Sequence, residues 1–318
     1  MELTTPTKIQ PLTPTISYGD GILFLGSCFA DEVGGICRGL GFNAMVNPFG
    51  VLYNPVSIAN AIMRLHSGEP FSHEEVVKVG EEFFCTFNHN TDFWSSSEEA
   101  LINHVNDHLA EAHEHFAHSK WIILSLGTAW VYRYRATLEV VANCHKMPSQ
   151  LFDRFCLSVP QTVTVLSDLV KLHPDKQFIF TVSPLRHLKD GLHGNQLSKS
   201  TLLLAVDQVC EHFENAHYFP AYEILLDELR DYRFYKEDMV HPTDQAVRYI
   251  WEQFVDFAID PSEKSAMKAA TELKQMLYHK PMFPDSDAFR KFEQQKENKI
   301  KALAQTCPHI LLEHLSES

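Results

Sequence analysis

The sequence has no long hydrophobic run, and this absence excludes a membrane-spanning helix. None of its stretches reaches about 18 consecutive apolar residues, roughly the least that a helix needs to cross a bilayer. Residues 1–20 are polar and interrupted by proline, without the apolar segment of a secretion signal. We therefore expect a cytoplasmic protein without a membrane span.

Metal-binding and disulfide motifs are also missing. The seven cysteines are scattered, odd in number and free of any CxxC pair, so free thiols in a reducing compartment are expected. The chain has 18 histidines but no HExxH string, and we interpret the histidine-rich segment 104–118 as a solvated helix face. The sequence thus predicts neither a metal site nor a cofactor.

Positive charge is in the minority. The chain has 27 Lys and Arg residues against 41 Asp and Glu residues, for a formal net charge of −14. Such an acidic chain gains nothing from counterion release on a polyanion, so no nucleic-acid partner is expected. With 45% hydrophobic residues over 318 positions, the chain can bury a large core. This balance is typical of a soluble enzyme.

Short apolar runs alternate with amphipathic segments along most of the chain. We expect buried strands at residues 21–25, 42–46, 121–126, 177–182 and 218–219. Helices are expected at residues 31–40, 54–65, 97–118, 159–173, 194–215 and 243–257. Hairpins are expected at 76–87 and within the irregular segment 129–158. Because alternating strands and helices form right-handed crossovers, the pattern predicts an α/β fold with a central parallel sheet between two helical layers.

The character of the sequence changes after about residue 260. Segments 264–277 and 287–304 are rich in Lys, Glu, Gln and Ala and predict two charged amphipathic helices. We therefore expect a catalytic domain over residues 1–260 and a C-terminal helical extension over residues 261–318.

Ser27 is the first candidate for a chemical role. It follows the first expected strand, in the string Gly26-Ser27-Cys28-Phe29-Ala30, and precedes a helix. This arrangement exposes a hydroxyl at the end of a strand and points helix N–H groups at a developing oxyanion. The alternative is that Ser27 only caps the helix. Cys28 is an alternative nucleophile, although buried packing is the simpler interpretation of its side chain.

Asp238 and His241 are the second candidate. A nucleophilic serine needs a base, and that base needs an orienting carboxylate. The spacing in Asp238-Met239-Val240-His241 lets the carboxylate meet one ring nitrogen and leaves the other nitrogen for Ser27. A capping Asp beside a surface His is the alternative. Taken together, the two candidates predict a triad of Ser27, His241 and Asp238.

With these residues the sequence resembles the GSCFA family, named for residues 26–30, and through it the SGNH/GDSL hydrolase superfamily. Further strings that carry the resemblance, which covers roughly residues 20–257, lie at 47–50, 126–130, 143–146, 183–187 and 234–235. It implies an SGNH-hydrolase-like three-layer domain that cleaves short-chain esters, such as O-acetyl esters of a carbohydrate or small molecule, through an acyl-serine. An O-acyltransferase with the same triad and a non-catalytic binding module are the alternatives.

The resemblance also implies an oxyanion hole and substrate-binding side chains. By position Gly50 matches the superfamily's glycine donor, which would act together with the Ser27 N–H. Thr128 stands where an asparagine is expected as the third donor, and Asn143 and Asn47 are its rivals. Polar groups near strand ends suggest that Asn47, His145 and Arg186 contact a sugar hydroxyl or a carboxylate, with ordinary loop polarity as the alternative. The expected partner is a small-molecule or glycan ester, and the sequence indicates no oligomeric state.

Overall fold

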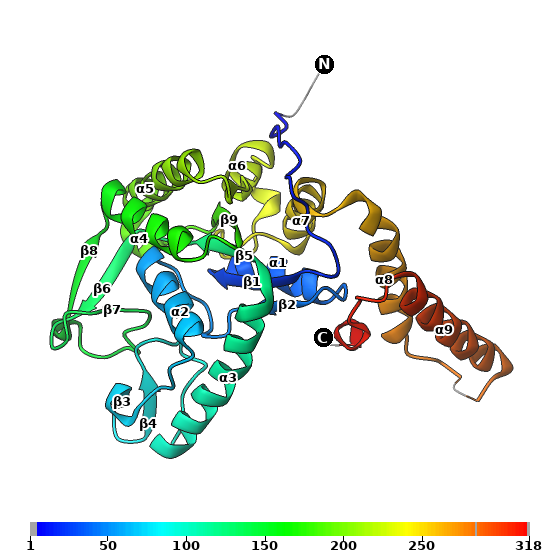
Figure 1. Ribbon diagram of the computed structural model, residues 1–318, viewed down its shortest axis with the longest axis horizontal. Coiled ribbons are helices and arrows are strands. Elements are labelled where there is room, and N and C mark those ends of the chain that lie inside the picture. Colours follow the sequence, from blue (N-terminus) through cyan, green and yellow to red (C-terminus); the bar gives the residue numbers. More distant parts are fainter. Residues whose placement is uncertain (1–4, 284, 317–318) are drawn as a thin grey trace.

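A five-stranded parallel sheet forms the middle of the computed structural model, which describes residues 5–283 and 285–316 (Figure 1). Its strands are β1 (Gly21–Gly26), β2 (Ala44–Val46), β5 (Ser119–Leu126), β9 (Gln177–Val182) and β10 (Ala216–Tyr218). They are ordered β2-β1-β5-β9-β10, and each neighbouring pair is parallel. The expected α/β fold with a central parallel sheet is therefore confirmed.

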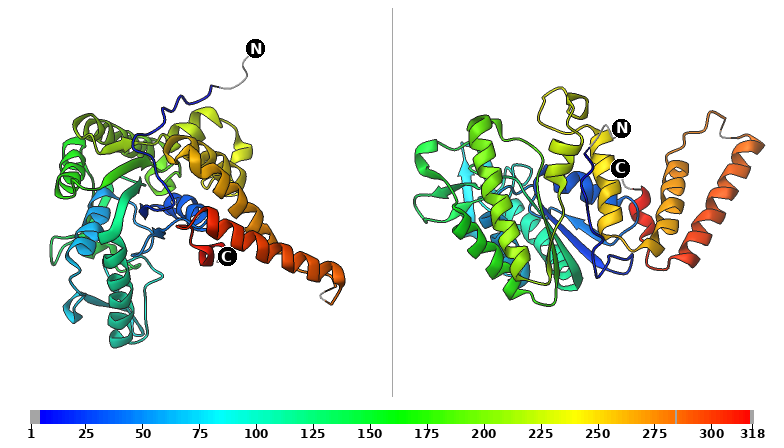
Figure 2. Two further views of the ribbon diagram at one scale, coloured as in Figure 1. Left: turned by 45° about the vertical axis from the view of Figure 1, so that its right-hand side comes forward. Right: turned by 90° about the horizontal axis from the view of Figure 1, so that it is seen from above.

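Helices cover both faces of this sheet. One face packs against α1 (Cys28–Arg38) and α7 (Asp244–Ala258). The other packs against α2 (Pro55–Ser67), α3 (Glu98–His118), α4 (Val159–Leu172) and α5 (Gly191–His212). Successive residues of β1 point into opposite cores, with Ile22 and Phe24 on the α1 side and Leu23 and Leu25 on the other. The three layers are visible from above in the right-hand view of Figure 2.

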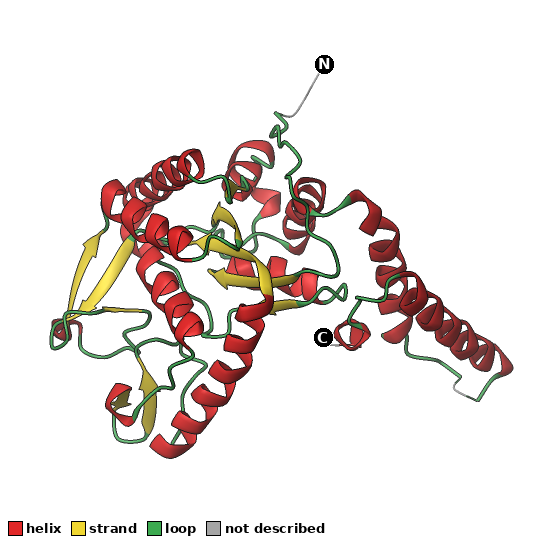
Figure 3. Ribbon diagram, viewed as in Figure 1, coloured by secondary structure: helices red, strands yellow, loops and turns green. Residues whose placement is uncertain are grey.

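Two small antiparallel sheets lie outside the central sheet (Figure 3). The first is the expected hairpin, formed by β3 (Val76–Val79) and β4 (Phe83–Thr86). The second joins β6 (Trp130–Tyr134), β7 (Val140–Val141) and β8 (Phe152–Cys156), where the sequence predicts at most a hairpin. Because β6 and β8 pair across a long excursion of the chain, tertiary contacts and not a local turn determine their register.

The C-terminal extension shares a core with the rest of the chain. It forms α8 (Lys264–Leu277) and α9 (Asp287–Thr306), close to the expected helices, and α9 projects away from the body (Figures 1 and 2). Met267, Leu273 and Leu303 are buried in the same cluster as α1 and α7. The segment after α9 returns to the sheet, where the Leu311 N–H donates to the Gly41 carbonyl at 2.8 Å. The extension is thus packed onto the domain that precedes it.

Gly26 determines how closely the end of β1 approaches β5. Its φ is +139°, and a Cβ added there would lie 2.1 Å from the carbonyl oxygen of Ser125. Only glycine tolerates this combination of dihedral angle and contact, and it is the residue immediately before Ser27.

We expect Gly26→Ala to lower the free energy of unfolding by about 3 kcal/mol or more, because backbone strain and a backbone clash add together. Urea unfolding followed by circular dichroism measures the loss. The matched control is Gly35→Ala in α1, where an added Cβ meets nothing within 4 Å and a small gain in helix stability is expected. Equal effects of the two substitutions would contradict the prediction.

Candidate active site

The candidate site lies where the direction of the sheet order reverses. The chain passes from β1 to β2 on one side, whereas β5, β9 and β10 follow one another on the other side. Such a reversal opens a crevice beyond the C-terminal ends of the strands. A cleft of about 410 Å³ is found here, bordered by Ser27 after β1, Thr128 after β5, Ser183 after β9 and His241 before α7. Polar residues that are far apart in the sequence therefore meet in one place.

Ser27 borders this cleft and also caps a helix. Its Oγ accepts a hydrogen bond from the Phe29 N–H at 3.3 Å and lies 2.9 Å from the Oγ of Ser125. The capping interpretation therefore holds, and the hydroxyl still faces the cleft. Cys28 packs against the core cluster on the α1 side, but it is only half-buried and also borders the cleft, with its Sγ 3.6 Å from the Tyr53 hydroxyl.

Asp238 and His241 form a hydrogen-bonded pair. The His241 Nδ1 lies 2.5 Å from the Asp238 Oδ2, and the other carboxylate oxygen accepts the backbone N–H groups of Val240 and His241 at 2.9 and 3.0 Å. These backbone bonds, followed by the imidazole bond, lower the pKa of Asp238 to about 2, so its carboxylate is ionised at neutral pH. Nδ1 is engaged, which leaves Nε2 for the cleft.

His241 does not hydrogen-bond to Ser27 in the part of the chain that the structure describes. Its side chain is 41% exposed, and Met239 in the same loop has a φ of +57°. The Ser27 hydroxyl instead pairs with Ser125, which sequence reasoning did not single out. Proton transfer needs a heavy-atom distance of about 2.6–3.2 Å, so either the loop or the serine rotamer must move for His241 to act as its base.

The expected backbone donors of the oxyanion hole already have partners. The Gly50 N–H donates to the Asn47 carbonyl at 2.7 Å, and Gly50 does not border the cleft. Only glycine fits at position 50, because its φ is +72° and an added Cβ would lie 2.1–2.5 Å from the Asn90 amide. The Ser27 N–H donates to the Ser125 carbonyl at 3.0 Å. The structure thus corrects the prediction for Gly50, which is not placed to bind an oxyanion.

Thr128 is the expected donor that does reach the cleft. Its Oγ1 accepts the Trp130 N–H at 3.1 Å and lies 3.0 Å from the Oγ of Ser198. When Ser198 donates in this pair, the Thr128 proton is available to an oxyanion. The first turn of α1 adds the Cys28 N–H, one of the N-terminal N–H groups for which a helix has no internal acceptor.

Asn143 and His145 are not among the residues that border the cleft. The Asn143 Oδ1 accepts the His145 N–H at 2.8 Å in a local turn, and the buried His145 ring hydrogen-bonds to the Thr86 carbonyl at 2.8 Å. Burial lowers the pKa of His145 and keeps the ring neutral. The predictions that Asn143 is an oxyanion donor and that His145 binds substrate are therefore not met by this arrangement.

Asn47 supports the serine turn and does not contact the cleft. Its Oδ1 accepts the Gly26 N–H at 2.8 Å, and its amide donates to the Asp31 carboxylate at 2.5 Å. Asn47 is 7% exposed and has a φ of +43°. It therefore connects the end of β2 to the residue before Ser27. This is a positioning role, not the substrate contact that the sequence suggested.

Arg186 does border the cleft, and so does His187, the last residue of the string 183–187. Tyr53 and Asn54 from the turn before α2, and Lys189 further along the chain, also border it, although the sequence does not single them out. Burial lowers the pKa of His187 to about 4, and its ring packs edge-on against Tyr53 at 5.5 Å. His187 is thus a second, neutral imidazole in the cleft.

Lys199 is fully buried beneath the cleft. Its Nζ donates at 2.6 Å to the Gly127 carbonyl and at 2.6 Å to the Ser183 carbonyl, the residues that follow β5 and β9. Burial, with a smaller contribution from Arg186, lowers its pKa to about 7. A lysine in an amphipathic helix usually faces solvent, so its sequence context gave no signal of this role.

Stability should depend on pH through Lys199. The folded chain releases this proton near pH 7 and the unfolded chain near pH 10.5, so the unfolded chain binds more protons between these values. The free energy of unfolding should therefore rise with pH in this window, by up to about 1.4 kcal/mol per pH unit. Urea unfolding at pH 7, 8 and 9 should show a steeper rise for the intact chain than for Lys199→Met. Lys171→Met, at an exposed position of α4, should keep the rise.

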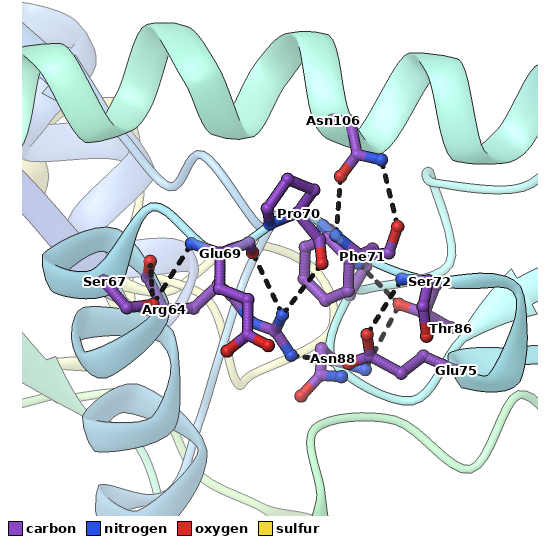
Figure 4. A network of polar contacts seen from close by, with 11 residues as sticks. Arg64, Ser67, Glu69, Pro70, Phe71, Ser72, Glu75, Thr86, Asn88 and Asn106 are labelled. Atoms are coloured by element: carbon purple, nitrogen blue, oxygen red, sulfur yellow. Dashed lines mark hydrogen bonds and ion pairs between the residues drawn. The ribbon is translucent and has the colours of Figure 1, made fainter.

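A larger cavity of about 750 Å³ lies elsewhere, between α2, the β3-β4 hairpin and β7. Its arginine is already engaged, because Arg64 donates to the Glu69 carbonyl at 3.0 Å and to the Glu75 carboxylate at 2.5 Å (Figure 4). Its guanidinium also lies over the Phe71 ring at 4.4 Å. No serine with a neighbouring base lines this cavity, so the smaller cleft is the better candidate for chemistry.

Two further searches concern only residues 5–283 and 285–316. They contain no helix long and apolar enough to cross a membrane. They also contain no group of three or more His, Cys, Asp or Glu side chains positioned to hold a metal ion.

Fold and site together define a three-layer α/β/α protein with a serine and an Asp–His pair at one cleft. Comparison with family models matches the GSCFA family over residues 21–254 and the C-terminal domain of GSCFA domain proteins over residues 270–317. The chain therefore belongs to the GSCFA family. Searches of curated proteins and of solved structures found no match.

Proposed function

We propose that this protein is a serine ester hydrolase of the SGNH/GDSL type, acting on short-chain esters, such as O-acetyl esters, of a carbohydrate or small molecule. One observation carries the proposal: Ser27, which follows β1, and His241, which is hydrogen-bonded to Asp238 just before α7, border the same cleft. A helix cap and a surface histidine would have no reason to meet at the reversal of the sheet order.

The proposed reaction proceeds through an acyl-serine. The His241 Nε2 accepts the Ser27 proton as Oγ attacks the ester carbonyl carbon, and the resulting tetrahedral oxyanion accepts hydrogen bonds from Thr128 and the Cys28 N–H. Collapse breaks the ester bond, and the departing alkoxide takes the proton from His241. Water then attacks the acyl-serine and gives its proton to His241. The free acid is released, and His241 returns the proton to the Ser27 oxygen, which restores the hydroxyl. Asp238 orients the ring and stabilises its charged form throughout.

An O-acyltransferase would use the same steps with an alcohol in place of water. The cleft is open enough to admit either, so the two activities differ only in the acceptor. All seven cysteines are unpaired, which supports a reducing, cytoplasmic location for the reaction.

A fluorophosphonate probe and a panel of aryl esters and acetylated sugars test the proposal. We expect the purified chain to be labelled once and to release acid from at least one ester. Product that appears only when an alcohol is added would favour the acyltransferase. The absence of both labelling and turnover would favour a non-catalytic binding module on this fold.

A further inference from the structure

The cleft has a positive lining, although the chain as a whole is strongly acidic. Three of the residues that border it, Arg154, Arg186 and Lys189, have basic side chains, and one, Asp190, has a carboxylate. The chain carries a formal charge of −14, so cations are scarce in it. The grouping of three basic side chains at one cleft therefore reflects either contacts that they make within the fold or a ligand that they bind.

Structure accounts for one of the three cations. Arg154 forms an ion pair with Asp190, whose side chain is 3% exposed, and its guanidinium lies over the Trp130 ring at 4.1 Å. These contacts fix the outer wall of the cleft. They also use the only carboxylate among the residues that border it.

The other two cations have no acidic partner within the described residues. Lys189 donates to the Tyr132 hydroxyl at 2.5 Å and forms no ion pair. Arg186 lies beside the Tyr235 hydroxyl and close enough to the buried Lys199 ammonium to disfavour its charge, again without a carboxylate. Arg186 is half-buried and Lys189 is exposed. A partly desolvated cation such as Arg186 raises the free energy of the empty site, and a bound anion relieves that cost.

We propose that the substrate carries an anionic group, a carboxylate or a phosphate, that binds to Arg186, with Lys189 on the same loop as a second contact. This inference rests on the proposed function, because it places the anion in the cleft that contains Ser27. A guanidinium binds planar carboxylates and phosphates through paired hydrogen bonds, and an ammonium adds a single donor. A neutral acylated sugar would leave both cations without an anion.

Anion binding is tested without turnover, using the full chain with Ser27→Ala. Titration calorimetry with inorganic phosphate and with succinate, against uncharged succinamide at constant ionic strength, separates the two sources of negative charge. We expect one of the anions to bind and succinamide not to bind. Arg186→Gln should weaken that binding by about tenfold or more, the size of a charge-assisted hydrogen bond. Arg290→Gln on α9, an exposed position with a side chain 72% accessible, is the matched control and should bind as before.

A second measurement uses the active chain and a pair of esters that differ mainly in charge, 4-acetoxybenzoate and 4-acetoxybenzamide. The ratio of their kcat/KM values should favour the anion, and Arg186→Gln or Lys189→Met should bring the ratio towards one. The inference is overturned if neither anion binds, or if the amide is turned over as well as the acid in the intact chain. Anion binding without turnover of any ester would instead refute the proposed hydrolase and leave the anion site standing.

Discussion

Replacing Ser27 with alanine is expected to abolish fluorophosphonate labelling and to lower kcat for ester hydrolysis by about 10⁴-fold or more. The reason is that the covalent path has no substitute once its nucleophile is removed, and only the oxyanion donors and binding contribute what remains. The loss should appear in kcat, because Ser27 is 1% exposed and contributes little surface for binding the ground state of a substrate.

Two neighbouring residues provide the controls for this substitution. Cys28→Ala removes the only other nucleophile in the string 26–30 and should retain labelling. Ser125→Ala removes the hydroxyl 2.9 Å from the Ser27 Oγ and should alter the rate far less than Ser27→Ala does. Labelling that persists in Ser27→Ala and disappears in Cys28→Ala would identify the thiol as the nucleophile. Circular dichroism of each variant excludes unfolding as the cause.

The second large effect is expected for Asp238→Asn, with a loss of about 10⁴-fold in kcat. The substitution keeps the shape of the side chain but removes the charge that orients the His241 ring and stabilises its protonated form. The pKa of Asp238 is about 2, so its carboxylate remains ionised in the intact chain well below neutral pH. Loss of activity between pH 5 and 7 would therefore not come from protonation of Asp238.

The same series of substitutions distinguishes His241 from a rival candidate for the general base, His187. His187 is a neutral imidazole in the same cleft, with its pKa lowered to about 4 by burial. We expect His241→Gln to match the loss of Asp238→Asn, and His187→Gln to cost much less. A double variant of Asp238 and His241 that is no worse than either single variant would show that the two act as one unit. The opposite ranking of the two histidines would assign the base to His187.

The central fold could be predicted because its signals are local. Buried strands such as Trp121–Leu126 are continuous apolar runs, and the helices between them have capping residues and an apolar face. The three-stranded sheet over 130–156 could not be predicted in this way. Its strand β7 has only two residues, and the pairing of β6 with β8 depends on tertiary contacts and not on a local sequence signal.

The sequence singles out the residues that meet at the candidate site better than it predicts their surroundings. Ser27 and the Asp238–His241 pair stand out by residue type and spacing. The assignments of Gly50 and Asn143 rest on the order of strings along the chain, and sequence order does not reveal that a backbone N–H is already engaged in a turn or that a residue lies outside the lining of the cleft. Lys199 was missed because a buried lysine and an exposed lysine look alike in a helical pattern.

The return of the C-terminal segment to Gly41 and Phe42 has a consequence for the order of folding. The cluster between the sheet and α2 to α5 uses residues from Leu23 to Tyr222, so it can be completed while the last helices are still being synthesised. The cluster on the α1 side needs residues as late as Leu315, including the contact of His314 with Phe42, 272 positions apart. Contacts of such long sequence separation form slowly. We therefore expect the nascent chain to expose the apolar side of α1 until the segment up to Leu315 has been synthesised, and this exposed face is a site at which chaperones can bind.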